Sequence, residues 1–297
     1  MTSIFVLSLT IVTIVAALLM RFTPRFAEKL YSRLIFYPIK YPSDDHGFED
    51  EIGYELQELA NIPIQDVSFT SREGLKLHGW FLRVPDAKFT VIVNHSNWGN
   101  VTRWLSWMRF FLQTGFSVFI YDYRGYGKSE GHPSFAGISN DAVSAYDYLI
   151  YEQGIKPTEI IAFGHSLGGG AVCELASRRK CAGVIVFGTF SSIRELAGVL
   201  MPFLKFLLKV FPESLFFQPA FDNAKLLGEV TTPLLILHGD RDEMIPVSQA
   251  QKLYENSVSS AKQLVIIPDG QHSGLPSGER ESYIALIRDF ARNHCGL

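Results

Sequence analysis

The chain has 297 residues and a formal net charge of -3, with 27 basic and 30 acidic side chains. Its 47% hydrophobic and 19% charged content excludes a disordered or low-complexity chain, and no basic excess points to nucleic acid as a partner. A mean hydropathy of +0.12 is high for a soluble protein, which predicts a membrane segment or an unusually apolar surface. The three scattered cysteines, Cys173, Cys181 and Cys295, predict neither a disulfide framework nor a zinc site.

An uncharged apolar stretch, Ile4–Met20, opens the chain. A helix over these 17 residues reaches roughly 25 Å, which is enough to span a thin hydrocarbon core. We therefore predict a transmembrane anchor over residues 1–20; a cleaved signal peptide and a buried core helix are the alternatives. The positive-inside rule then places the amino terminus outside and the rest of the chain in the cytoplasm, because the basic residues follow the anchor: Arg21, Arg25, Lys29 and Arg33.

Residues 21–62 are expected to connect this anchor to the domain that follows. Thr23 and Pro24 predict a helix start. Phe26, Leu30 and Leu34 then form an apolar stripe beside the basic one. This pattern favours a helix that lies on an anionic membrane face, and an ordinary surface helix explains it equally well.

The remainder, residues 63–297, alternates short β-rich runs with helical stretches. Two alternating runs predict an antiparallel pair, and six continuous apolar runs predict strands that are buried on both faces. The expected strands are Asp66–Thr70, Leu75–Leu82, Thr90–Asn94, Ser117–Tyr121, Glu159–Phe163, Gly183–Phe187, Pro233–Leu237 and Gln263–Ile267. The expected helices are Val101–Gln113, Ile138–Gln153, Leu167–Arg179, Ser248–Ser257 and Gly278–His294. This order predicts an α/β fold with a mostly parallel eight-stranded sheet and helices on both faces.

Residues 191–229 interrupt this alternation with a strongly apolar segment around residues 202–212. Ligands of open parallel sheets bind beyond the carboxyl ends of the strands, so we interpret the insert as a small helical cap or lid over an apolar substrate. Its Phe203 and Phe206 are expected to contact that substrate. The alternative is a helix that closes part of the core.

Gly164-His165-Ser166-Leu167-Gly168 matches the pattern Gly-x-Ser-x-Gly directly between a predicted strand and a predicted helix. This setting is typical of a nucleophile elbow, a tight turn that projects the serine hydroxyl beyond the sheet edge. The two glycines leave room for the turn, and the helix amino terminus favours developing negative charge at Ser166. The sequence therefore predicts Ser166 as a nucleophile.

A serine nucleophile needs a base and an orienting carboxylate, and in this fold the chain order is serine, acid, histidine. Asp242 follows the predicted strand that ends at Leu237, and His272 follows the one that ends at Ile267. We expect Asp242 as the acid, with Asp240 as its rival, and His272 as the base.

A tetrahedral intermediate needs two backbone donors for its oxyanion. We expect them at the amide of Leu167 and at the amide of Asn97 in the loop after the third strand, with Ser96 as the alternative to Asn97. Trp98 and His165, adjacent to these positions, are expected to bind substrate together with the two phenylalanines of the insert.

With these motifs in place, the sequence resembles the α/β-hydrolases, and most closely the membrane-anchored serine hydrolases of the Bem-type (ABHD) branch. The resemblance covers about nine-tenths of the chain and is carried by Leu34–Pro38, Gly74–Phe81, Asp122–Ser129, Gly164–Gly170, the Asp242 motif and Gly270–His272. It implies an esterase, lipase or thioesterase that needs no cofactor and no metal. It also implies supporting, non-chemical roles for Asp122 and Arg124.

One departure concerns the oxyanion loop, where the family pattern His-Gly-Asn is replaced by His95-Ser96-Asn97. A side chain at Ser96 narrows the acyl pocket or moves the donor.

We expect a hydrolase that cleaves lipophilic acyl esters or thioesters through an acyl-enzyme at a membrane. A peptidase or amidase with the same triad, and a non-catalytic membrane-anchored scaffold, are the alternatives.

Overall fold

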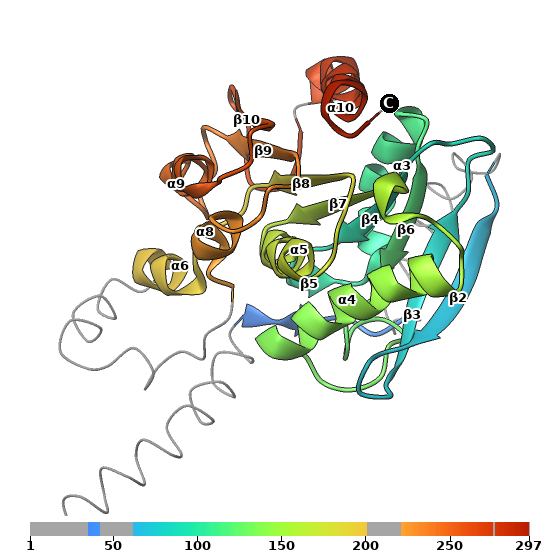
Figure 1. Cartoon of the computed structure of the whole chain (residues 1–297). Helices are drawn as coiled ribbons and strands as arrows, with labels where there is room; N and C mark the ends of the chain where they lie inside the picture. Colours follow the sequence, from blue (N-terminus) through green and yellow to red (C-terminus); the bar gives the residue numbers. More distant parts are fainter. Residues whose placement is uncertain (1–34, 42–61, 201–220, 276, 297) are drawn as a thin grey trace, which may run out of the picture.

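The computed structural model describes residues 35–41, 62–200, 221–275 and 277–296 (Figure 1). Its centre is an eight-stranded sheet with the strand order β10-β9-β8-β7-β4-β6-β3-β2. Only the pairs β2–β3 and β3–β6 are antiparallel, so the prediction of a mostly parallel eight-stranded sheet is confirmed. The strands are β2 Ile64–Thr70, β3 Lys76–Leu82, β4 Thr90–Asn94, β6 Ser117–Tyr121, β7 Ile160–His165, β8 Gly183–Phe187, β9 Leu234–Gly239 and β10 Lys262–Ile267.

Helices cover both faces of this sheet, with α3 and α10 on one side and α4, α5, α8 and α9 on the other (Figure 1). Successive residues of one strand point to opposite faces, so Ile92 joins one apolar core while Val91 and Val93 join the other. This explains the continuous apolar runs. The helices are α3 Leu105–Gln113, α4 Phe135–Tyr151, α5 Leu167–Arg178, α6 Ile193–Leu200, α8 Asn223–Leu227, α9 Ser248–Asn256 and α10 Arg280–His294.

Helix boundaries differ from the expected ones where a capping side chain is present. α4 begins three residues before Ile138 because the Ser134 hydroxyl accepts a hydrogen bond from the amide of Gly137. The stretch expected to be helical from Val101 begins instead with a 3₁₀ turn, Val101–Trp104, which Asn100 caps through the amide of Thr102. Two further 3₁₀ turns are Pro157–Glu159 and Ser277–Glu279.

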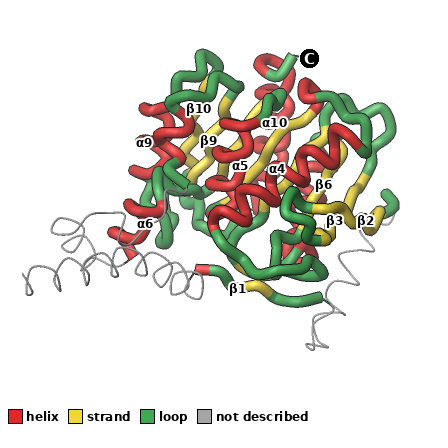
Figure 2. The backbone as a smooth tube through the Cα atoms, turned by 60° about the horizontal axis from the view of Figure 1, so that its bottom comes forward, coloured by secondary structure: helices red, strands yellow, loops and turns green. Residues whose placement is uncertain are grey.

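Residues 35–41 form a strap that the sequence did not predict. Its strand β1, Tyr37–Pro38, pairs in parallel with β5, Trp98–Gly99, outside the main sheet. Figure 2 shows β1 along the periphery of the domain. Phe36 fastens the strap by burying its ring against Phe135, with ring centroids 5.1 Å apart. The chain just after the predicted connector helix is therefore part of the folded domain.

Three predictions lie outside the described residues: the anchor Ile4–Met20, the connector helix up to Leu34, and the apolar segment around residues 202–212 with Phe203 and Phe206. Within the described ranges, no helix combines the length and the apolar character needed to cross a bilayer.

Candidate active site

The turn between β7 and α5 has the geometry of a nucleophile elbow. Ser166 adopts φ 54° and ψ -117°, a strained conformation for a residue with a side chain. A Cβ atom at Gly164 would lie 2.2 Å from the carbonyl oxygen of Gly168, and one at Gly168 would lie 1.9 Å from that of Asn94. Only glycine fits these two positions. The sequence pattern predicted this turn because its spacing reflects that steric requirement.

Ser166 and His272 face one another, although 106 residues separate them. The His272 Nε2 atom lies 3.1 Å from the Ser166 Oγ atom, which is hydrogen-bond distance. Both residues are buried at the carboxyl edge of the sheet. An imidazole in this position can accept the hydroxyl proton as a general base.

Asp242 completes the arrangement on the other side of the imidazole. Its Oδ2 atom lies 2.8 Å from His272 Nδ1, while its Oδ1 atom accepts the amides of Met244 at 2.9 Å and Ile245 at 2.8 Å. Burial alone would raise the pKa of this fully enclosed carboxyl, but these hydrogen bonds hold it below its usual value. The rival Asp240 is exposed. The structure thus brings Ser166, His272 and Asp242 together.

Two further buried histidines support this group, and sequence reasoning gave neither of them that position. His238 Nε2 donates to the carbonyl of Ile245 at 2.7 Å, beside the Asp242 carboxylate at 3.5 Å. His165 Nε2 donates to the carbonyl of His272 at 2.7 Å. Burial and the neighbouring His272 lower the pKa of His165 to about 3, so its ring is neutral.

His165 occupies an aromatic enclosure beneath the base. Its ring centroid lies 4.9 Å from that of His272, 5.1 Å from that of Phe187 and 5.4 Å from that of Trp104. The ring is buried, and its one engaged nitrogen holds the His272 backbone. A substrate-binding role for His165 stays a prediction, while its contact with the base is direct.

One expected oxyanion donor, Leu167, lies in the elbow itself, and the other, Asn97, lies in the loop after β4. Leu167 is the first residue of α5, where helix amides have no acceptor four residues earlier. Asn97 lies in the loop between β4 and β5, and its side-chain amide donates to the carbonyl of Ile35 at 2.6 Å. Ser96 offers its carbonyl to His95 Nδ1 at 2.7 Å. The donor roles of Leu167 and Asn97 stay predictions.

The strap holds this oxyanion loop by its backbone. The amide of Tyr37 donates to the carbonyl of Asn97 at 2.9 Å, and the amide of Ile39 donates to that of Gly99 at 3.0 Å. The Tyr126 hydroxyl donates to the carbonyl of Asn97 from the other side at 2.8 Å. Residues near the amino terminus therefore fix a loop next to the nucleophile.

Asp122 and Arg124 support loops, as the resemblance implies. The Asp122 carboxylate accepts His78 Nδ1 at 2.8 Å and the amide of Val101 at 2.9 Å. The Arg124 guanidinium pairs with the buried Asp141 carboxylate at 2.8 Å.

Among the residues that the structure describes, no group of three or more histidine, cysteine, aspartate or glutamate side chains is arranged to hold a metal ion.

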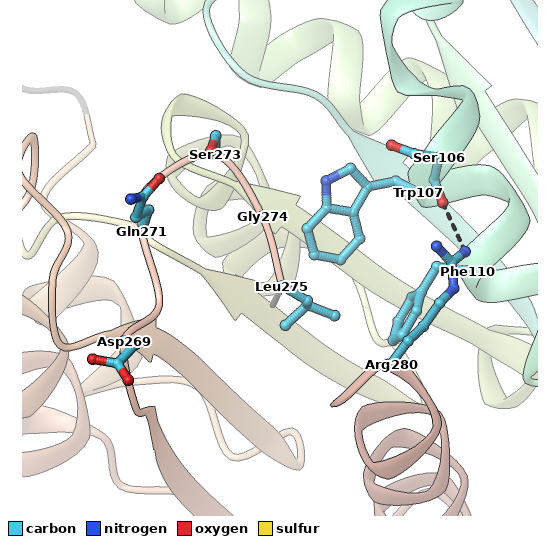
Figure 3. Close-up of a pocket in the computed structure, with 9 residues that line it drawn as sticks. All are labelled: Ser106, Trp107, Phe110, Asp269, Gln271, Ser273, Gly274, Leu275 and Arg280. Atoms are coloured by element: carbon cyan, nitrogen blue, oxygen red, sulfur yellow. Dashed lines mark hydrogen bonds between the residues drawn. The ribbon is translucent and has the colours of Figure 1, made fainter. Parts of the chain in front are cut away.

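A cavity of about 370 Å³ adjoins the base (Figure 3). Gln271 and Ser273, the chain neighbours of His272, line it on one side. Its apolar wall comes from Trp107, Phe110 and Leu275, and Figure 3 shows Arg280 lying beside Phe110. The remaining lining residues are Ser106, Asp269 and Gly274. Ser166, Asp242 and His272 are not among the lining residues, so the cavity lies next to the segment that carries His272.

Trp98, expected to bind substrate, lies on β5 with 47% of its surface exposed. The Arg103 guanidinium lies over its ring, 5.1 Å from the centroid. Trp98 is not among the residues that line the cavity beside His272. Its contact with substrate stays a prediction.

Sequence comparison relates this chain to known proteins. A family model described as serine aminopeptidase, S33 matches residues 85–225 and 216–280. An uncharacterized membrane protein of Saccharomyces cerevisiae is 32% identical over 255 residues, which cover 84% of this chain and 86% of that one. The α/β hydrolase domain-containing protein WAV2 of Arabidopsis thaliana is 34% identical, with 71% and 73% covered. The bem46 protein of Schizosaccharomyces pombe is 26% identical, with 88% and 85% covered.

Solved structures share the fold at lower sequence identity. An esterase of Pyrococcus furiosus superposes with a TM-score of 0.68 at 20% identity, covering 88% of this chain and 99% of that one. Acetyl xylan esterase 1 of Thermoanaerobacterium superposes with a TM-score of 0.61 at 17% identity, covering 86% and 96%. At these identities the likeness concerns the fold alone.

Proposed function

We propose that this chain is a serine hydrolase of lipophilic carboxylic esters or thioesters. The proposal starts from its family, since the chain belongs to the serine aminopeptidase S33 family of α/β-hydrolases and to its Bem-type branch. The observation that carries the proposal is the pair of hydrogen-bond contacts from Ser166 through His272 to Asp242. An unreactive hydroxyl gains a base from this order of groups, and the base gains a fixed orientation and a counter-charge.

In the proposed reaction, Ser166 Oγ attacks the acyl carbonyl while His272 Nε2 accepts its proton. The buried Asp242 carboxylate holds the Nδ1 proton and stabilises the imidazolium that forms. The amides of Leu167 and Asn97 stabilise the oxyanion. His272 then returns the proton to the leaving oxygen or sulfur, and water releases the acyl group from Ser166.

The substrate class rests on the surroundings of these groups. The leaving group must approach the protonated His272, and the cavity lined by the chain neighbours Gln271 and Ser273 is the space proposed for part of the substrate. Its wall of Trp107, Phe110 and Leu275 accepts apolar atoms, while Arg280 and the serines accept polar ones. The apolar insert around residues 202–212 adds a second reason to expect lipophilic acyl chains.

The membrane anchor over residues 1–20, with a cytoplasmic catalytic domain, is a separate part of the proposal. It rests on the uncharged run Ile4–Met20 and the basic residues that follow it. The yeast relative that bears the name of a membrane protein adds support. We expect a carboxyl-terminal tag to be protected from protease in intact cells. Cleavage of the tag would show that the domain lies on the outer side of the membrane.

Labelling of the full-length protein with a fluorophosphonate probe tests the hydrolase proposal directly. We expect the wild type to be labelled and Ser166→Ala to remain unlabelled, because the probe reacts with an activated serine only. Folding of both proteins is checked by circular dichroism. Absence of labelling in the folded wild type would refute the enzyme proposal and favour a non-catalytic scaffold. A panel of esters with varied chain length and head group then defines the substrate.

A second candidate function, cleavage of amides, is favoured by the aminopeptidase description of the family model. The same triad can expel an amine if His272 protonates the leaving nitrogen. Amides and esters with matched acyl chains discriminate the two functions. We expect turnover of the esters and thioesters; turnover confined to the amides would replace the ester proposal.

A further inference from the structure

Two exposed aromatic side chains stand next to one another beside the oxyanion loop. Tyr37 and Trp98 are register partners in the β1–β5 pair, with 51% and 47% of their surfaces exposed. In the described part of the chain, the strand registers pair no two of the other exposed large apolar residues with one another. These residues are Tyr151, Met244, Val258 and Ile266. Most large apolar residues here are buried, so this exposed aromatic pair is exceptional on the domain.

The backbone around this aromatic pair is rigidly held. Phe36, which precedes Tyr37, is buried. Asn97, which precedes Trp98, donates to the carbonyl of Ile35 and accepts the amide of Tyr37. Gly99, at φ +90°, leaves room for Arg103, since a Cβ atom there would lie 3.0 Å from the Arg103 Cγ atom. The exposure of the two rings is therefore built into the loop and does not result from a loose chain end.

One cationic side chain contacts the pair, and two more lie at the strap. The Arg103 guanidinium lies 5.1 Å from the Trp98 ring centroid, and Lys128 lies 5.1 Å from that of Tyr41 in the same strap. The exposed Lys40 also belongs to the strap; its ammonium donates to the carbonyl of Ser129 at 2.9 Å, and Lys128 is paired with Asp66 at 2.8 Å. Tyrosine and tryptophan with a polar tip, flanked by arginine and lysine, form the composition that proteins place at the head-group level of membranes.

The position of the pair in the chain selects its partner. Tyr37 lies 17 residues after Met20, the end of the predicted anchor, so even a fully extended connection keeps the pair within about 60 Å of it. The intervening stretch carries the basic residues Arg21, Arg25, Lys29 and Arg33. A surface tethered in this way, behind a basic stretch, lies within reach of anionic lipid head groups.

We propose that Tyr37 and Trp98 dock the catalytic domain on the head-group region of the membrane and hold the oxyanion loop at the lipid surface. Because Asn97 directly precedes Trp98, docking brings the expected oxyanion donor to the place where a lipophilic ester leaves the bilayer. The inference rests on the proposed anchor and is independent of the hydrolase activity.

Tryptophan fluorescence tests this contact selectively. The chain contains four tryptophans; Trp80, Trp104 and Trp107 are at most 8% exposed, and only Trp98 is open. The full-length protein is reconstituted into phosphatidylcholine–phosphatidylserine vesicles that contain lipid brominated near the upper part of the acyl chain. We expect the brominated lipid to quench a component of the wild-type emission and the vesicles to shield that component from acrylamide.

Matched variants assign the signal. Trp98→Phe should lose the lipid-quenched component, whereas Trp107→Phe should retain it. Adding Tyr37→Trp to Trp98→Phe moves the reporter to the partner position and should restore quenching. Restored quenching also shows that altered folding does not cause the loss in Trp98→Phe. Wild-type protein that floats with the vesicles but stays open to acrylamide and unquenched by brominated lipid overturns the docking proposal alone. Protein that does not float overturns the anchor and the docking together.

Discussion

The hydrogen bond from His165 to the backbone of His272 predicts that a neutral side chain positions the proposed base. His165→Phe keeps an aromatic ring in the enclosure of Trp104 and Phe187 but removes the donor at Nε2. His165→Gln removes the ring but places an amide nitrogen at a similar reach from the backbone. The two variants therefore separate the hydrogen bond from the packing.

The expected size of the effect follows from burial. The bond is 2.7 Å long and buried, and an unsatisfied buried carbonyl costs about 1–3 kcal/mol. The His272 loop escapes this cost by shifting its carbonyl toward water, which moves Nε2 away from Ser166. With about 1.4 kcal/mol for each factor of ten in rate, His165→Phe should lose on the order of tenfold to a hundredfold in kcat.

The assay is ester hydrolysis with kcat and KM resolved separately, beside the rate of fluorophosphonate labelling. We expect His165→Phe to lower kcat with KM nearly unchanged, and His165→Gln to recover most of the loss. A purely structural role would instead lower the melting temperature of both variants and leave the kcat of the folded fraction intact. Full activity in His165→Phe together with loss in His165→Gln would refute the reasoning, because packing and not the donor would then matter.

Three further predictions concern the same site. Asp242→Asn should reduce turnover roughly 10³–10⁴-fold by removing the charge that orients and stabilises His272, while the exposed Asp240→Asn stays near wild type; equal losses would contradict the assignment. Asn97→Ala removes the hydrogen bond to the carbonyl of Ile35, so it should destabilise the strap by about 1 kcal/mol and slow labelling of Ser166 severalfold. The control Asn256→Ala removes a hydrogen bond within α9 and should leave the labelling rate unchanged. Equal labelling rates of the two variants would contradict a role of the strap. Burial lowers the pKa of His165 to about 3 and that of His95 to about 4, so the unfolded chain binds more protons below about pH 6.5. The free energy of unfolding should therefore fall from pH 7 to pH 5, by on the order of 1 kcal/mol per pH unit for each histidine. Urea titrations measure it, and a free energy of unfolding that stays constant would disprove their neutral state.

The sheet, the elbow and the meeting of Ser166, Asp242 and His272 could be predicted from sequence because each has a local pattern. Apolar runs mark buried strands, and two glycines mark the turn at Ser166. The strap over residues 35–41 could not be predicted, since a two-residue strand has no periodicity and its partner Trp98 lies about 60 residues away. The contacts of His165 and His238 were also hidden. Their partners are backbone carbonyls, which leave no signature in the identity of any residue.

The strand order has a consequence for how this protein would lose activity. Ser166 follows the central strand β7, whereas His272 follows β10, the last strand of the sheet, which pairs with β9 alone. Edge elements open locally at a lower free energy than central ones. Partial opening of β10 withdraws His272, the proposed base, while the elbow and most of the core stay folded. Heat inactivation of this protein should therefore begin before its global melting, and the earliest damage should be reversible on cooling.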